Sequence, residues 1–345
     1  LYAGPPEGRP TDGWSLLHDY PEGVGICSSC HAPAAPLDML VTADIRNIDE
    51  VAKHGVHCDY CHKVQDVDVE NVGLTHGRFA ARLLRPAHEQ LFFGPLDDVD
   101  RGEDSYLPLQ SESRFCAGCH EGIVFGVPVY TTYTEWQNSP AAARGQTCQS
   151  CHMKPDGEMT NIAPDAGGIE RDPMTLASHR LLVGGLETML RECIDVGLTW
   201  DTANDGTRLQ VRLMAHDVGH RVPTGFIDRH LILVVDAFDA ASQPVEVSGP
   251  QLPEAAGDLT GRAGHLMAKL LADVEGLAPV AFWQAGTVID DTRLEPDVPR
   301  IQAFQLPPQS TSVRVRLLYR RFWQATTSAK QWPDDTLVVY DQVSN

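Results

Sequence analysis

Cysteine and histidine occur in this chain in a spacing that attaches a cofactor. The motif Cys-x-x-Cys-His occurs four times, at residues 27–31, 58–62, 116–120 and 148–152. In such a motif the two cysteines form thioether bonds to a haem and the histidine ligates its iron. We therefore expect four covalent haems c on Cys27, Cys30, Cys58, Cys61, Cys116, Cys119, Cys148 and Cys151. The proximal iron ligands would be His31, His62, His120 and His152.

Three other interpretations of the cysteine pairs compete with haem attachment. Structural zinc is the strongest of them, because two Cys-x-x-Cys pairs can supply four thiolates to one tetrahedral ion, but it leaves the adjacent histidines unexplained. Thioredoxin-like redox pairs require a βαβ setting. Disulfides within the pairs would close only tiny loops. The ninth cysteine, Cys193, lies outside the motifs and is expected to be a buried, inert thiol.

Length and charge limit the possible partners. A chain of 345 residues and 37.8 kDa allows two domains. The net charge of -20, to which haem propionates would add, makes nucleic acid and anionic membrane surfaces poor partners. No apolar run reaches the roughly 18 residues of a membrane span. Since haem is attached to this motif outside the bacterial cytoplasm and Leu1 opens no signal segment, we expect a mature periplasmic or extracellular protein.

The motifs predict two domains of different character. All four lie between Cys27 and His152, so residues 1–200 are predicted to form a tetrahaem cytochrome domain, mostly α and loop with little regular structure. Porphyrins would supply much of its buried apolar surface. Residues 201–345 are predicted to form an antiparallel β-sandwich-like domain, because residues 208–213 and 313–317 alternate apolar and polar side chains.

Several further elements are expected from local patterns. Residues 230–238 and 336–341 are predicted strands. Residues 173–196 are expected to form a bridging helix broken near Gly184 and Gly185, and residues 261–277 an inserted helix. The apolar residues 91–93, followed by a turn and an acidic cluster, are expected to form a loop that covers a haem face.

Histidines exceed the number that the motifs use. The remaining ten can serve as distal ligands and make bis-histidine ligation of every haem possible: His18, His54, His57, His76, His88, His179, His216, His220, His230 and His265. His57 directly precedes a motif, so it can reach a neighbouring haem. His179 is expected on the bridging helix, and His220 in a turn fixed by proline and glycine. His88, His18 and His54 complete the candidates, with His54 competing against His57.

Methionine is the other possible axial ligand, and it would raise the reduction potential. Met153, Met159 and Met174 are close to the fourth motif in sequence. With histidines in surplus, these side chains are expected to pack instead. Bis-histidine ligation and the surrounding negative charge both favour ferric iron, so low potentials are expected.

A family resemblance appears when the motifs are read in order. CAGCHEG at 116–122, the segment 132–136, CQSCHMKP at 148–155, SHRLLVGG at 178–185 and GHRVPTG at 219–225 follow one another. Over roughly residues 14–240 the chain resembles bacterial multihaem cytochromes c. The resemblance implies a secreted electron carrier, related in haem packing to the nitrifiers' tetrahaem carrier and more distantly to the tetrahaem subunits of extracellular cytochrome filaments. It also implies that His179 and His220 are distal ligands.

One departure from the family leads to competing functional hypotheses. Where such chains often carry a histidine after the tryptophan, residues 139–143 have none, so the fourth haem must find its ligand elsewhere, for example on a neighbouring subunit of a filament. Electron transfer between redox partner proteins, without catalysis, is the main hypothesis. The alternative is an oxidoreductase with one open-coordination haem acting on a small nitrogen compound. In a third hypothesis the β domain docks the cytochrome onto a partner or a like subunit.

Overall fold

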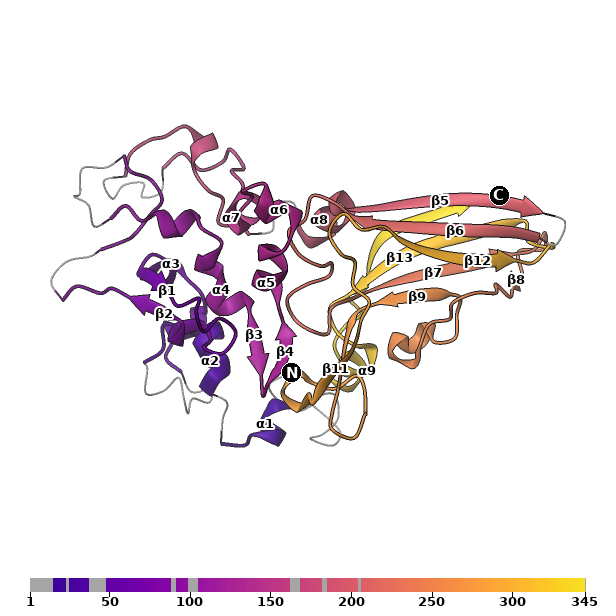
Figure 1. Ribbon diagram of the computed structural model, residues 1–345, viewed down its shortest axis with the longest axis horizontal. Helices are drawn as coiled ribbons and strands as arrows, with labels where there is room; N and C mark the ends of the chain where they lie inside the picture. Colours follow the sequence, from indigo (N-terminus) through magenta and orange to yellow (C-terminus); the bar gives the residue numbers. More distant parts are fainter. Residues whose placement is uncertain are drawn as a thin grey trace.

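A computed structural model describes residues 15–22, 25–36, 48–87, 91–98, 105–161, 168–181, 185–203 and 206–344. The first half is built from short helices and two small hairpins, and the second half from longer strands (Figure 1). None of the helices within these ranges has the length and apolar character needed to cross a bilayer.

Short helices dominate the first half of the chain. They are α1 (Leu16–Asp19), α2 (Gly25–His31), α3 (Cys58–Cys61), α4 (Arg114–His120), α5 (Thr132–Gln137), α6 (Pro140–Ala143) and α7 (Cys148–His152). Two antiparallel hairpins lie among them, β1 (Val64–Val67) with β2 (Ala81–Leu83) and β3 (Gly122–Val124) with β4 (Val127–Tyr130). The expectation of helix and loop with little regular structure agrees with this arrangement.

The second half contains two larger antiparallel sheets. One has the order β12-β6-β5, formed by β5 (Ile194–Ala203), β6 (Gly206–Ala215) and β12 (Arg300–Leu306). The other has the order β14-β13-β7-β8, with β9 also paired to β7; its strands are β7 (His230–Phe238), β8 (Pro244–Val245), β9 (Gly264–Met267), β13 (Ser312–Arg320) and β14 (Leu337–Ser344). The expected boundary between residues 200 and 201 falls inside β5.

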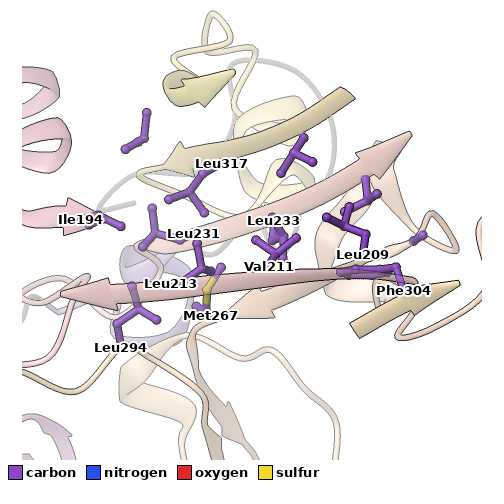
Figure 2. Close-up of a cluster of buried hydrophobic side chains, with 14 of the residues drawn as sticks. Ile194, Leu209, Val211, Leu213, Leu231, Leu233, Met267, Leu294, Phe304 and Leu317 are labelled. Carbon is purple, nitrogen blue, oxygen red and sulfur yellow. The ribbon is translucent and has the colours of Figure 1, made fainter. Parts of the chain in front are cut away.

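One hydrophobic core joins these two sheets. Leu209, Val211 and Leu213 of β6 meet Leu231 and Leu233 of β7, as the alternation along β6 predicts (Figure 2). The other face of β7 is also buried, because Ile232 and Val234 belong to a second cluster with Trp323. Burial on both faces explains the continuous apolar run of β7 at residues 231–235.

Two expected helices are replaced by other structure. Residues 261–277 contain β9 and β10 (Lys269–Ala272), which pair with β7 and with β11 (Thr287–Asp291), so the expected inserted helix is wrong. The expected bridging helix is wrong in its first part: a 3-10 turn covers Pro173–Thr175 and α8 begins only at Gly185 (Gly185–Cys193), after which β5 starts. The last helix, α9, spans Gln324–Ala329.

The two halves are packed against each other. Val127 and Val129 of β4 share a cluster with Ile227 and Leu271 from the β region. Helix α1 also rests on that region, since the Trp283 indole donates to the Asp19 carboxylate at 2.7 Å. Helices α5 and α6 lie between the attachment motifs and the sheets (Figure 1). This contact brings groups from the β region next to the motifs.

Candidate haem sites

Every attachment motif is formed by a short helix. Helices α2, α3, α4 and α7 contain the cysteine pairs, and each motif histidine lies at or directly after the helix end. Residues three apart share a helix face, so each pair of thiols points to the same side. In α7 the first turn is fixed by a capping box between Thr147 and Ser150.

Cysteines from different motifs are in contact. A hydrogen bond with Cys119 lowers the pKa of the Cys30 thiol, and one with Cys116 lowers the pKa of Cys148 to about 7. The first and third motifs therefore meet at their sulfurs, and so do the third and fourth. Groups bonded to these sulfurs would therefore be close neighbours.

Polar contacts join the second motif to the fourth. The Gln110 side chain donates to the Cys61 carbonyl at 3.1 Å, while Gln149 of the fourth motif donates to the Gln110 carbonyl at 3.0 Å. The backbone N–H of Cys148 donates to Ser113 Oγ at 2.9 Å. All four motifs thus belong to one connected cluster.

Gly77 allows the first motif to pack closely. It has a φ of 52°, and a Cβ on it would lie 2.1 Å from the Ser29 carbonyl oxygen. Any other residue would have to push α2 away. The next turn of the same segment reaches the third motif, where a Cβ on Gly118 would lie 3.2 Å from Ala80.

The second motif histidine faces His179. The ring centres of His62 and His179 are 6.1 Å apart with 31° between their planes. His62 Nδ1 donates to the Phe93 carbonyl at 2.5 Å, and His179 Nδ1 donates to the Ala177 carbonyl at 3.1 Å. A carbonyl can only accept, so both rings carry the proton on Nδ1 and leave Nε2 free to bind a metal.

His179 is held by the fourth motif and not by a helix as expected. The N–H of Ser178 donates to the Met153 carbonyl at 3.1 Å, and its hydroxyl donates to the Asp156 carboxylate at 2.7 Å. Met153, the alternative ligand next to His152, contributes its backbone here. The expected haem-covering loop contacts His62 through Phe93, whose N–H donates to the His62 carbonyl at 2.8 Å.

The fourth motif histidine faces His220, which comes from the β region. The ring centres of His152 and His220 are 6.1 Å apart and their planes differ by 18°. His220 Nδ1 donates to the Arg221 carbonyl at 3.0 Å, which again leaves Nε2 free. Burial lowers the pKa of His220, so its imidazole stays neutral, as a metal ligand must be.

Both facing pairs fit a haem iron. Imidazole nitrogens bind metals at about 2.0–2.1 Å, so two rings on opposite faces of one iron have centres roughly 6 Å apart. The structural zinc alternative finds no such support, because the described residues contain no group of three or more His, Cys, Asp or Glu side chains that could hold a metal ion. When bound at these motifs, haem supplies one-electron redox chemistry.

The remaining candidate histidines differ in their surroundings. His57 Nε2 is buried without a hydrogen-bond partner. His54 is exposed in the turn Ala52–His54, and His18 is exposed and bonded to Asp19 at 3.2 Å. His88 lies outside the described residues.

Sequence reasoning did not single out His76. It is 8% exposed, its Nδ1 has no hydrogen-bond partner, and it lies close to the backbone of Glu121, next to His120. The one sequence signal for it is the adjacent Gly77, which marks a close approach of two backbone segments.

Cys193 is half-buried, and burial raises its pKa to about 11, as expected for an unreactive thiol.

Comparisons with known proteins bear on the whole chain. No family model and no curated protein sequence matches it. Among solved structures it is similar to a penta-heme cytochrome c552 from Thermochromatium tepidum, with 25% identity and a TM-score of 0.68, over 92% of this chain and 83% of that chain. This likeness extends through the β region as well as the haem-attachment region, so the chain has the fold of a multihaem c-type cytochrome.

Proposed function

We propose that this chain is a tetrahaem cytochrome that transfers electrons outside the cytoplasm between redox partner proteins. It carries four attachment motifs, one fewer than the number of haems named for the similar cytochrome c552. The observation that supports this proposal best is the pair of facing histidines, His62 with His179 and His152 with His220, at the spacing of two axial ligands.

The two remaining motif histidines need distal ligands as well. His57 and His76 are the two histidines of the described haem-attachment region that bury a ring nitrogen without a partner. A buried polar atom without a partner is costly, and iron ligation would remove that cost. We assign His57 and His76 as the distal ligands of the two haems whose proximal ligands are His31 and His120, in either pairing.

The contacts between motifs support conduction. Cys30 touches Cys119 and Cys116 touches Cys148, so groups bonded to them lie within the short distances that electron tunnelling requires. The helices that carry these cysteines hold such groups in place. With bis-histidine ligation and a net charge of -20, low potentials follow.

Spectroscopy of the holoprotein tests the proposal. A haem stain and mass spectrometry should give four haems per chain, the ferric protein should show low-spin signals only, and the ferrous protein should not bind carbon monoxide. A high-spin signal with carbon monoxide binding would instead support the alternative, an oxidoreductase with one open iron that acts on a small nitrogen compound.

Self-association is a separate part of the proposal. Because His220 offers the fourth haem a ligand within the chain, a filament is not required for ligation, and assembly would rest on surface contacts. Mass photometry of the holoprotein over a range of concentrations tests self-association. Particle masses that increase in multiples of one chain support assembly, and a single monomeric species at all concentrations contradicts it.

A further inference from the structure

Two sequence segments that are far apart meet beside the fourth motif. Helix α5 contributes Glu135 and Trp136, and the loop between β6 and β7 contributes Gly219, His220 and Arg221. The Arg221 N–H donates to Glu135 Oε2 at 3.0 Å, and a Cβ on Gly219 would lie 2.9 Å from the Trp136 ring. The loop that presents His220 is therefore seated directly on α5.

The Glu135 carboxylate is fully engaged. Its Oε1 accepts from Thr131 Oγ1 at 2.9 Å and from the Arg293 guanidinium at 2.7 Å, while Oε2 accepts from Arg221. The side chains of Glu135 and Arg293 are only 12% and 7% exposed. A carboxylate held by three donors in a buried setting has a single orientation.

Arg221 is held from both sides. Its N–H is bound by Glu135, and its carbonyl accepts the Nδ1 proton of His220. Rotation of this residue would move the acceptor that fixes the imidazole. The carboxylate of Glu135 thus controls the ring of His220 through one intervening residue.

The same helix also reaches the other side of the haem site. The Trp136 indole donates to the Gln146 carbonyl at 2.8 Å, and Gln146 lies two residues before Cys148. Helix α5 therefore contacts the chain segments that carry His152 and His220. It links the two segments that present these rings.

We propose that Glu135 is a positioning residue that fixes His220 opposite His152 at the fourth haem. This inference rests on the proposed function, in which His220 is the distal ligand there. Glu135 does not touch the iron; it sets the ligand's place through Arg221. Its negative charge near the haem additionally favours ferric iron, so its loss should raise one midpoint potential.

Two substitutions separate these effects. In E135A the Arg221 N–H loses its acceptor and Arg293 loses a buried charge partner, so one of the four haems should become high-spin and bind carbon monoxide when reduced. In E135Q the side chain keeps its shape and one acceptor oxygen but loses its charge, so all haems should stay low-spin while one midpoint potential rises.

The control is D236A. Asp236 is 15% exposed and pairs with Arg262 and Arg316 within the β region, so its loss removes a comparable ion pair away from His220. It should lower the melting temperature without a high-spin signal. If E135A and E135Q behave like D236A, with low-spin haems and unchanged potentials, Glu135 is only structural and the inference is wrong.

H220A distinguishes failure of this inference from failure of the proposed function. If H220A gives one high-spin haem while E135A remains low-spin, the ligand assignment stands and Glu135 does not position it. If H220A also leaves every haem low-spin, His220 is not a ligand, and both the proposed ligation and the inference fall.

Discussion

His152 and His220 face each other with ring centres 6.1 Å apart, although one ends α7 and the other lies in the loop between two strands of the β region. In the proposed ligation, the distal ligand of the fourth haem comes from the opposite half of the chain. On this proposal, removal of the β region should disturb haem ligation and not only assembly.

Replacing His220 by alanine should open one coordination position. One of the four haems becomes high-spin in the ferric state and binds carbon monoxide in the ferrous state, measured by electron paramagnetic resonance and optical titration. H216A is the matched control, because His216 is a half-buried histidine of the same loop that bonds Asp195 and Asp217 and faces no motif histidine. An unchanged spectrum of H220A would contradict the pairing.

His57 and His54 form a natural comparison three residues apart. His57 buries a ring nitrogen that has no partner, whereas His54 is exposed. H57A should therefore yield one high-spin haem, and H54A none. H76A should behave as H57A does at a different haem, so the double variant should bind two equivalents of carbon monoxide. Equal spectra for H54A and H57A would remove His57 from the ligand set.

The third motif should be the most sensitive to loss of its cofactor. Its cysteines contact both Cys30 and Cys148, so the double substitution of Cys116 and Cys119 by serine removes one haem and a neighbour of two others. Mass spectrometry should show one haem fewer than wild type, and the melting temperature should fall. C193S is the control and should keep the full haem count. A double variant with all haems attached would disprove the attachment role.

The β region should carry a pH dependence set by His230. This side chain is buried against Trp323, and burial lowers its pKa from 6.5 to about 4. Between these pH values the unfolded chain binds a proton that the folded chain does not, so the free energy of unfolding falls by about 3 kcal/mol as pH drops from 6.5 to 4.

Replacing His230 by phenylalanine keeps an aromatic ring on Trp323 and removes this titration. Urea denaturation followed by circular dichroism at several pH values should show a smaller loss of stability for H230F than for wild type. Two nearby groups also affect the titration: the positive charge of Arg320 helps to lower the pKa of His230, and burial raises the pKa of Asp228. Both residues are present in H230F and in wild type, so the comparison isolates His230. Parallel pH profiles would contradict the prediction.

Strands could be predicted from alternating or continuously apolar residues, but not where the composition favours helix and strand pairing overrides that propensity. Residues 208–213 alternate as β6 requires, and the predicted strand at residues 230–238 matches β7. Residues 266–272 are rich in Leu, Ala, Met and Lys, which favour helix, yet they form β9 and β10 because β7 and β11 offer open edges.

The attachment residues follow from the sequence, whereas the distal ligands depend on the fold. Cys-x-x-Cys-His is a local pattern, so the four motifs can be recognised without a structure. Local sequence context and the family resemblance both indicate His179 and His220 as distal ligands, but the motif histidine that each one faces is known only from the ring distances. The sequence signals His76 only through the adjacent Gly77, and the burial of its side chain and its unpartnered ring nitrogen bring it forward.

The origin of His220 in the β region has a consequence for biogenesis. The chain emerges from its N-terminus, so the residues of the fourth motif are available for attachment before His220 and its strands have been exported. On the proposed ligation, an iron held by His152 would have a temporary sixth ligand or none until the sheets close. Exchange of that ligand for His220 would then mark completion of the mature protein. A change in the optical absorption spectrum of the haem would report this exchange.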